Sequence, residues 1–367
     1  MTKVLLLCNS LRSGGAERTL LDLIRQLSEQ DFDLDLECLC LHEEGEWFDG
    51  LAEVIPTSCL RLPPRIRVAE LIKLRKAIDV CQPTILQTFH RGANRWGAVA
   101  GRATGVPVIV NSLQNVYRGN GRLGRGFDRL GLRFATHGVA CSDSVRRFYI
   151  EDCRVPAHKL TTIHNSVDLS RFSPVRAATG RSDEAFSGST LICVASLTEQ
   201  KGLSVLLEAL SLLPEGTKDF RLLLVGEGPL RSDLERQASR LGLADRVHFL
   251  GMREDVPDLL VASTVFVLPS LWEGLGVAAL EAMAASLPVV ASSVDGLREV
   301  VEDGVTGILV PPGDGRLLSS ALEKVLGDNA LRDRMGRAGR ERVARMFSAP
   351  AMAAAYQGLW ERLALAS

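Results

Sequence analysis

Short apolar runs alternate with amphipathic segments along the first half of the chain. Strands are predicted for the apolar runs at 3–8, 33–41, 84–88, 107–111 and 138–141. Helices are predicted where apolar residues recur at spacings of three and four, near 20–27, 66–80, 93–104 and 126–136. The strand candidates are almost continuously apolar, as parallel strands covered on both faces are. This half therefore predicts a parallel sheet with helices on both sides.

The same alternation fills the second half. Strands are predicted at 190–196, 220–226, 246–251, 264–270, 288–292 and 307–310. Helices are predicted at 201–213, 229–241, 253–262 and 276–285, and again after 310 to the end. The stretch between the halves is rich in Gly, Pro and small polar residues, as linkers are. We therefore expect an N-terminal domain at 1–172, a linker at 173–188, a second domain at 189–345, and a C-terminal helix at 346–367 that packs back on the first domain.

Two doubly wound α/β domains in tandem are the predicted fold. The length of 367 residues suits two domains of ordinary size. Open parallel sheets bind ligands beyond the carboxyl ends of their strands. Two such domains facing each other would enclose a central cleft with a site contributed from both sides.

Composition excludes several classes of protein. Hydrophobic residues make up 46% and charged residues 24%, and the net charge is −1, which excludes disorder, collagen and coiled coil. The longest apolar run is shorter than a membrane span, and the N-terminal run reads as a buried strand rather than a signal peptide. Eight cysteines without CxxC and six histidines without HExxH predict reduced packing thiols and no metal site. A cytoplasmic location is expected.

Three loops carry candidate chemistry. The first predicted strand runs into NSLRSGGAER, where Gly14 and Gly15 let backbone amides approach an anion at a helix N-terminus. This loop lacks the spacing of a dinucleotide fingerprint or a P-loop, and glycines are common in such turns. Lys201 and Gly202 stand between a strand and a helix, where a lysine can neutralise a diphosphate. An exposed surface lysine is the alternative.

The third loop pairs two carboxylates. Glu273 follows the strand TVFVLPS, and Glu281 lies eight positions later in a helix that begins near Gly276. Carboxylates accept bonds from hydroxyl groups, and amides freed by Gly274 and Gly276 can hold phosphate. This combination suits a sugar nucleotide. A helix-capping and a solvated glutamate are the alternative.

The motifs, taken in this order, resemble those of glycosyltransferase family 4, the group 1 glycosyltransferases. The resemblance runs over nearly the full length and rests on GGAER, NSVDLSRFSP at 165–174, SLTEQKG, VGEGPLR at 225–231, the two glutamates separated by seven residues, PVVAS and GILVPPGD. Each motif alone is not specific. Their combination in one order is.

The resemblance implies a GT-B fold of two Rossmann-like domains and a hexosyltransferase that retains configuration and needs no metal or cofactor. The donor would be a nucleotide-sugar, with a UDP-sugar preferred, and the acceptor a glycan or lipid-linked glycan of polysaccharide, lipopolysaccharide or envelope biosynthesis. A sugar-nucleotide epimerase of GT-B type and a catalytically silent nucleotide-sugar-binding subunit are the alternatives. No nucleic-acid partner is expected, and no DxD-like carboxylate pair lies near the expected donor site.

The resemblance also implies roles for individual residues. The catalytic residues would be His90, Lys201 and Glu273, with Glu281 on the ribose. The donor site would further include Gly14, Gly15, Leu250, Gly251, Met252, Leu275, Gly276 and Val277. Ser196 stands where family members commonly have an arginine, so one diphosphate charge is missing. Either Lys201 suffices together with helix dipoles, or another arginine replaces that charge, and Arg12 is the candidate.

Positive charge is concentrated in the first half. Residues 54–147 hold 16 basic and four acidic residues. A run of arginines at spacings of three and four predicts one basic helical face: Arg118, Arg122, Arg125, Arg129 and Arg133. A solvated helix face is the ordinary explanation. The alternative is a surface for an anionic acceptor or an acidic membrane, which would hold the protein peripherally at the inner face of the cytoplasmic membrane.

Overall fold

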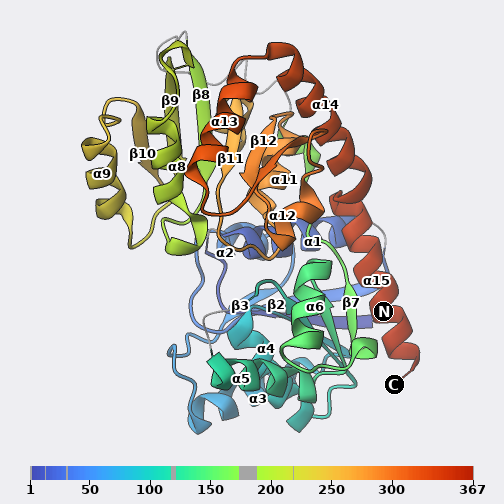
Figure 1. Cartoon of the computed structure of the whole chain (residues 1–367). Coiled ribbons are helices and arrows are strands. Elements are labelled where there is room, and N and C mark those ends of the chain that lie inside the picture. The colour runs from blue at the N-terminus through green and yellow to red at the C-terminus, as the bar shows by residue number, and fades with distance from the viewer. Residues whose placement is uncertain are drawn as a thin grey trace. The chain divides into compact units, whose positions relative to one another are not determined.

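The computed structural model divides into two compact units (Figure 1). Unit 1 comprises Met1–Ser166 and Ala349–Ser367, and unit 2 comprises Val167–Ser348. The structure describes residues 2–12, 14–29, 32–116, 121–172, 188–217 and 219–366. Each unit has its own parallel sheet.

Within the described part of unit 1, seven parallel strands form one sheet in the order β3-β2-β1-β4-β5-β6-β7. The strands are β1 (Thr2–Cys8), β2 (Leu34–Cys40), β3 (Thr57–Cys59), β4 (Ile85–Phe89), β5 (Val108–Leu113), β6 (His137–Ala140) and β7 (Leu160–Thr162). Side chains of β1 alternate between two cores. Val4, Leu6 and Cys8 point to one face, and Leu5 and Leu7 to the other.

Helices cover both faces of this sheet (Figure 1). The helices are α1 (Gly15–Glu29), α2 (Phe48–Ala52), α3 (Val68–Cys81), α4 (Arg91–Ala103), α5 (Gly121–Phe134), α6 (Asp143–Glu151) and α15 (Ala349–Leu365). On one face the core joins β1 to α1 and α15, through Leu20, Leu23 and Trp360 among others. On the other face it joins β1 to α3 and α4. The C-terminal helix is thus part of the first core.

Within the described part of unit 2, six parallel strands form a sheet in the order β10-β9-β8-β11-β12-β13. The strands are β8 (Ser189–Val194), β9 (Phe220–Val225), β10 (Val247–Gly251), β11 (Val265–Leu268), β12 (Val289–Ser292) and β13 (Gly307–Val310). The longer helices are α8 (Leu203–Ser211), α9 (Arg231–Arg240), α10 (Val256–Val261), α11 (Val277–Ala284), α12 (Asp295–Val300), α13 (Gly315–Leu326) and α14 (Asn329–Met346). The doubly wound parallel fold predicted for both halves is therefore observed.

The strand order reverses once in each sheet, and this places the site. In unit 1 the reversal lies between β1 and β4, and in unit 2 between β8 and β11. Helices leave the sheet in opposite directions at such a point, so the loops that follow the two strands diverge and leave room for a ligand. The loops after β1, β4, β8 and β11 carry the residues that the sequence singled out.

The observed domain boundary differs from the expected one at residue 172. Residues 167–172 belong to unit 2. Val167 N donates to Phe347 O at 2.9 Å, and Arg340 Nη1 donates to Phe172 O at 3.0 Å. These bonds hold the segment on unit 2, although no change of composition marks residue 167 in the sequence.

Most elements that the sequence did not predict are short. They are α2, β3, α6, β7 and α12. Strands of three residues, such as β3 and β7, have too few positions to show an alternating pattern. α6 begins at a Ser142 cap, whose Oγ accepts from Val145 N at 3.1 Å.

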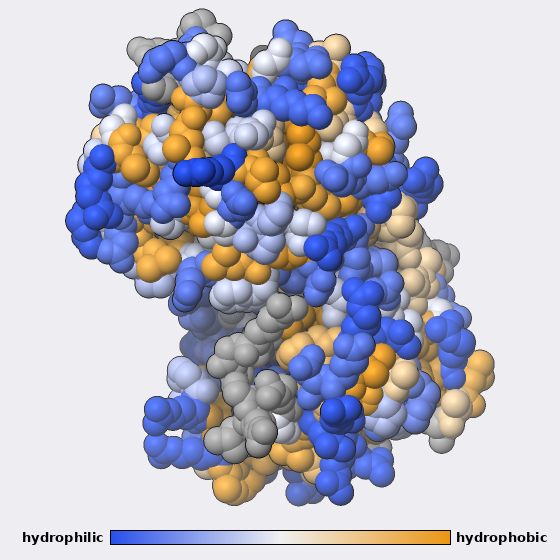
Figure 2. Space-filling model, viewed as in Figure 1, coloured by the Kyte–Doolittle hydropathy of each residue, from blue (hydrophilic) through white to orange (hydrophobic). Residues whose placement is uncertain are grey.

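The cysteines and the surface are those of a packed α/β protein. All eight cysteines are free thiols, and all but Cys59 are buried. On the face drawn in Figure 2, hydrophobic residues are interspersed among hydrophilic ones. Among the described residues, no helix combines the length and the apolar character that crossing a membrane requires.

Candidate active site

In unit 2, Lys201 and Glu273 meet at the point where the strand order reverses. Lys201 ends a short 3-10 helix (Glu199–Lys201) after β8, and Glu273 lies in the loop after β11. Lys201 Nζ lies 2.5 Å from Glu273 Oε1, and the two side chains are 18% and 7% exposed. Ser270 Oγ donates to the same carboxylate oxygen at 2.8 Å. Two predicted catalytic residues, 72 positions apart, therefore form one mostly buried pair.

Two hydrogen bonds to backbone groups hold these two loops together. Leu271 N donates to Gln200 O at 2.7 Å, and Gln200 Nε2 donates to Trp272 O at 3.0 Å. Gly202 adopts φ +61°, and a Cβ there would lie 2.2 Å from Pro269 O. Only glycine permits this approach. The glycine of the SLTEQKG motif thus serves contact between the loops as well as chain direction.

The loop before α11 is equally compact. Gly276 has φ +90° and precedes the first residue of α11, Val277. A Cβ on Gly276 would lie 2.5 Å from Leu297 Cδ2, and one on Gly296 would lie 2.6 Å from Gly274 O. The Leu275 side chain is buried, so this residue offers a ligand only its backbone. The N-terminal amides of α11 form the anion-binding end of a helix close to Glu273.

Glu281 has a partner that the sequence did not indicate. Arg171 Nη1, from the 3-10 helix Leu169–Phe172, lies 3.5 Å from Glu281 Oε1, and both side chains are mostly buried. Both residues belong to unit 2. The signal in the sequence was the NSVDLSRFSP motif, which contains Arg171. A ribose on Glu281 would share the carboxylate with this guanidinium.

The other donor-site candidates of unit 2 lie at the ends of β8 and β10. Ser196 follows β8, and its Oγ lies 3.4 Å from Thr198 Oγ1. Leu250 and Gly251 end β10, Gly251 O accepts from Gly226 N at 2.8 Å, and the Met252 side chain is exposed. These positions share the carboxyl edge of the sheet with Lys201 and Glu273.

In unit 1 the loops after β1 and β4 meet in the same way. His90 ends the β4 loop as the residue before α4, and its Nε2 lies 3.1 Å from Glu17 Oε1 on the first turn of α1. Burial raises the pKa of the Glu17 carboxyl, but the interaction with His90 outweighs it and holds that pKa below its usual range. Gly15 is the first residue of α1, and Gly14 precedes it.

Arg12 is already paired. Its Nη2 lies 2.5 Å from Glu43 Oε2, and both side chains are well exposed. To replace the missing diphosphate arginine at Ser196, Arg12 would have to leave this carboxylate. Glu43 of unit 1 therefore competes with a diphosphate for the Arg12 guanidinium.

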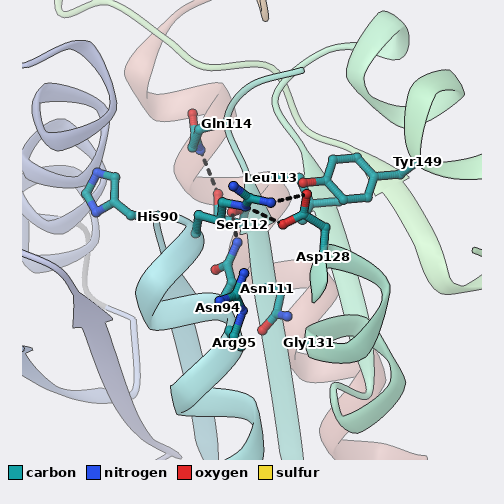
Figure 3. Close-up of a pocket in the computed structure, with 11 residues that line it drawn as sticks. His90, Asn94, Arg95, Asn111, Ser112, Leu113, Gln114, Asp128, Gly131 and Tyr149 are labelled. Atoms are coloured by element: carbon teal, nitrogen blue, oxygen red, sulfur yellow. Dashed lines mark hydrogen bonds and ion pairs between the residues drawn. The ribbon is translucent and has the colours of Figure 1, made fainter. Parts of the chain in front are cut away.

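A small polar cavity lies beside His90, at the carboxyl ends of β4 and β5 (Figure 3). Arg91 reaches Asp128 with two bonds, from Nε to Oδ1 at 2.5 Å and from Nη2 to Oδ2 at 3.0 Å. Asn94 Nδ2 donates to Ser112 O at 2.7 Å. The further lining residues include Arg95, Asn111, Gln114 and Tyr149.

The sequence analysis did not find this cavity. Asp128 was the available signal, because it is the one acidic residue between Asp79 and Asp143 and stands in an arginine-rich helix. In Figure 3 the ring of His90 points away from the other labelled residues. His90 therefore lines the cavity, but its ring is directed away from the other lining residues.

The predicted basic face is only partly described. Arg118 lies outside the described residues, and so do the side chains of Arg122 and Arg125. Arg129 and Arg133 lie one turn apart on α5, and both are exposed.

Comparison with known proteins covers both units. The family described as glycosyl transferases group 1 matches residues 182–342, and glycosyltransferase family 4 matches residues 13–171. A relative in Escherichia coli, UDP-Gal:alpha-D-GlcNAc-diphosphoundecaprenol alpha-1,3-galactosyltransferase, is 28% identical over 339 residues, covering 87% of this chain and 86% of its own. A Mycobacterium leprae phosphatidyl-myo-inositol mannosyltransferase is 36% identical over 211 residues, covering 56% of this chain and 54% of its own.

Solved structures share the fold. The crystal structure of Anabaena HepE in complex with UDP-glucose has a TM-score of 0.86 and 22% identity, and the match covers 99% of this chain and 100% of that one. Together the two family matches span nearly all of both units. The chain belongs to the group 1 glycosyltransferases of the GT-B family, and it is an enzyme of the hexosyltransferase class.

Proposed function

We propose that the protein moves a hexose from a UDP-sugar to a glycan or lipid-linked acceptor in envelope or polysaccharide biosynthesis, retaining configuration and using no metal ion. The observation that carries this proposal is the Lys201–Glu273 pair at the strand reversal of unit 2, beside the N-terminus of α11. It brings a cation, a carboxylate and a helix N-terminus to one edge of one sheet. A diphosphate with an attached sugar needs these groups.

The donor follows from that chemistry. The Lys201 ammonium and the amides at the start of α11 match the charge of a diphosphate, and Glu273 matches sugar hydroxyls. Uridine as the base is supported by two named proteins: the E. coli relative is named for UDP-Gal, and HepE was solved with UDP-glucose. The same relative is named for a diphosphoundecaprenol acceptor, which supports a lipid-linked one.

The mechanism rests on stabilising the leaving group. Negative charge builds on the phosphate oxygens as the nucleoside diphosphate departs, and a preorganised cation and amides stabilise it. Lys201 supplies that cation from the chain itself. Glu273 Oε1 already receives contacts from Lys201 and Ser270, which makes this oxygen a poor nucleophile. We therefore place the acceptor's attack on the face from which the diphosphate leaves, without a covalent sugar–enzyme intermediate.

Nucleotide binding tests the donor. UDP should raise the melting temperature more than GDP or ADP, because a ligand at 100 times its dissociation constant adds about 2.7 kcal/mol to the free energy of unfolding. Glu281→Gln should reduce this shift, since it weakens the expected bond to the ribose. A thermal-shift series with the three nucleotides and their sugars measures both effects. A larger shift with GDP would reject the uridine assignment.

Chelation tests the absence of a metal requirement. Transfer from the UDP-sugar that the thermal-shift series identifies should proceed at an unchanged rate in excess EDTA, because Lys201 and backbone amides neutralise the leaving group. NMR of the product should show the anomeric configuration of the donor. Activity that disappears in EDTA and returns with Mg²⁺ or Mn²⁺ would contradict the first part, and an inverted product the second.

A basic groove supports contact with an anionic membrane. Arg129 and Arg133 of α5 line a groove together with Arg154 and Lys159. No carboxylate is among its described lining residues, and Leu130 and Pro156 provide apolar surface. Phe134, one turn from Leu130, is partly exposed beside them. Basic and apolar groups on one surface suit the headgroup region of an acidic bilayer.

Vesicle binding tests this surface. Each basic residue near an acidic membrane contributes on the order of 1 kcal/mol, screened by salt. The protein should sediment with anionic vesicles at low salt, and Arg129→Glu with Arg133→Glu should abolish this. The matched control is the same double reversal at Arg334 and Arg337, exposed on α14 of unit 2. Equal loss in both variants would show that net charge, not the groove, is responsible.

A further inference from the structure

The imidazole of His90 is contacted on both of its nitrogens. Nε2 is buried 3.1 Å from Glu17 Oε1, and Nδ1 accepts from the Asn9 backbone N–H at 3.5 Å. The Nε2–H direction is not well aligned with the carboxylate, so the first contact is mainly electrostatic. The His90 and Glu17 side chains are 14% and 18% exposed. All three residues belong to unit 1.

The backbone of His90 is strained in a way that frees its side chain. His90 has φ +72° and ψ +154°, which residues other than glycine rarely adopt. Such a conformation is strained and persists where the surroundings impose it. Here Asn9 Oδ1 accepts from Ala93 N at 3.0 Å and takes over the capping of α4. The His90 ring makes no cap bond and turns toward Glu17 instead.

Gly14 makes room for the carboxylate. A Cβ on Gly14 would lie 2.4 Å from Glu17 Oε2. The GGAER motif thus joins a residue without a side chain to a glutamate three positions later, at the start of α1. The motif has a structural purpose inside unit 1, whether or not its amides also meet the donor.

We infer that Glu17 is a positioning residue for His90, orienting its ring and selecting the tautomer with the proton on Nε2. A proton on Nδ1 would meet the Asn9 N–H, and a lone pair on Nε2 would face the carboxylate. Both contacts therefore favour one tautomer and one orientation. The inference rests on the proposed function in one respect, the contact of His90 with the transferred sugar.

The catalytic consequence is preorganisation. A ring ordered before the donor arrives loses no rotational freedom when the sugar binds, and small displacements of such groups lower rates strongly. The charge of the Glu17 carboxylate is favoured by His90 itself, in line with the lowered pKa of this glutamate. Gln at position 17 keeps an acceptor oxygen, whereas Leu keeps only the bulk.

Turnover and ring geometry are measured on three variants of the full chain. Glu17→Leu should lower kcat on the order of 10- to 100-fold with the donor KM nearly unchanged, and Glu17→Gln should recover part of the loss. Glu29→Gln, at the exposed end of the same helix, is the matched control. In ¹⁵N NMR of the imidazole, wild type should show His90 protonated on Nε2, and Glu17→Gln should keep this. Glu17→Leu should lower the fraction protonated on Nε2, because only the Asn9 N–H then favours that tautomer.

The spectra separate this inference from the proposed function. If His90→Ala is as active as wild type, the proposed contact of His90 with the sugar is wrong. The NMR test of the His90 tautomer is unaffected by that result. If Glu17→Leu keeps both kcat and the Nε2 tautomer, positioning by Glu17 is wrong. Should Glu17→Leu not fold, the carboxyl ¹³C titration of Glu17 in the folded His90→Ala variant decides. The pKa of Glu17 should rise there, and an unchanged pKa would overturn the inference.

Discussion

Replacing Lys201 by alanine is expected to lower turnover by at least about 100-fold, because loss of one preorganised group that stabilises transition-state charge has this effect. Glu273→Ala should cause a loss of similar size, since Glu273 binds the sugar in the proposed site. The two substitutions should also change the free energy of unfolding, because each residue is the other's ion-pair partner at 2.5 Å. Activity is measured as kcat and KM for the donor.

Stability distinguishes the single variants from the double variant. Lys201→Ala leaves the Glu273 carboxylate, 7% exposed, without its cation and should reduce the free energy of unfolding by roughly 3 kcal/mol. Removing both side chains should restore much of that stability while activity stays lost. Urea unfolding measures this. The control is Lys3→Ala, which breaks a more exposed Lys3–Glu37 pair of 2.7 Å and should change the free energy of unfolding much less.

If folded Lys201→Ala has wild-type turnover, the Lys201–Glu273 pair is not part of the active site. A double variant no more stable than Lys201→Ala would show instead that the pair does not depend on mutual charge. The two measurements therefore test binding chemistry and folding separately.

Gly202→Ala is expected to lower both stability and turnover. The new Cβ would lie 2.2 Å from Pro269 O, a backbone atom that cannot move without shifting the loop that carries Glu273. Overpacking of this kind, added to the left-handed φ of +61°, should lower the free energy of unfolding by about 2–4 kcal/mol. Turnover should fall as well, because Lys201 and Glu273 no longer meet at the same distance.

Gly242→Ala is the matched control. Gly242 has nearly the same backbone conformation, φ +69°, but no atom lies within 4 Å of a Cβ there. It should show only the cost of the conformation, on the order of 1 kcal/mol, with unchanged turnover. Equal losses in the two variants would mean that the conformation, and not the approach to Pro269, makes glycine necessary at 202.

The contact partners of Arg171 and Glu17 could not be predicted from the sequence. Both lie inside motifs that the sequence analysis quoted, yet their partners are 110 and 73 positions away. Side chains so far apart meet only after parallel strands set the order of their loops. The same holds for the cavity between α4 and α5, in which Arg91 contacts Asp128 across 37 positions.

The domain boundary illustrates a related limit. Composition placed the linker after residue 172, where small and polar residues accumulate. The structure assigns 167–172 to unit 2 because Val167 and Phe172 bond to residues near the end of that unit. One bond joins two backbone groups and the other joins the Arg340 side chain to a carbonyl 168 positions away, so no local pattern in the sequence reports them.

The sequence by itself determined the class of fold and the existence of both parallel sheets, and it singled out the glutamates, glycines and lysine of the proposed donor site. It could do so because periodicity and motifs are local properties, legible within about 20 residues. Only the tertiary structure decided that Lys201 contacts Glu273, that Arg171 contacts Glu281, that Arg12 is held by Glu43 and that Glu17 contacts His90. The reason is physical: the strand order of each sheet brings distant loops together, and that order is a property of the packed core rather than of any segment.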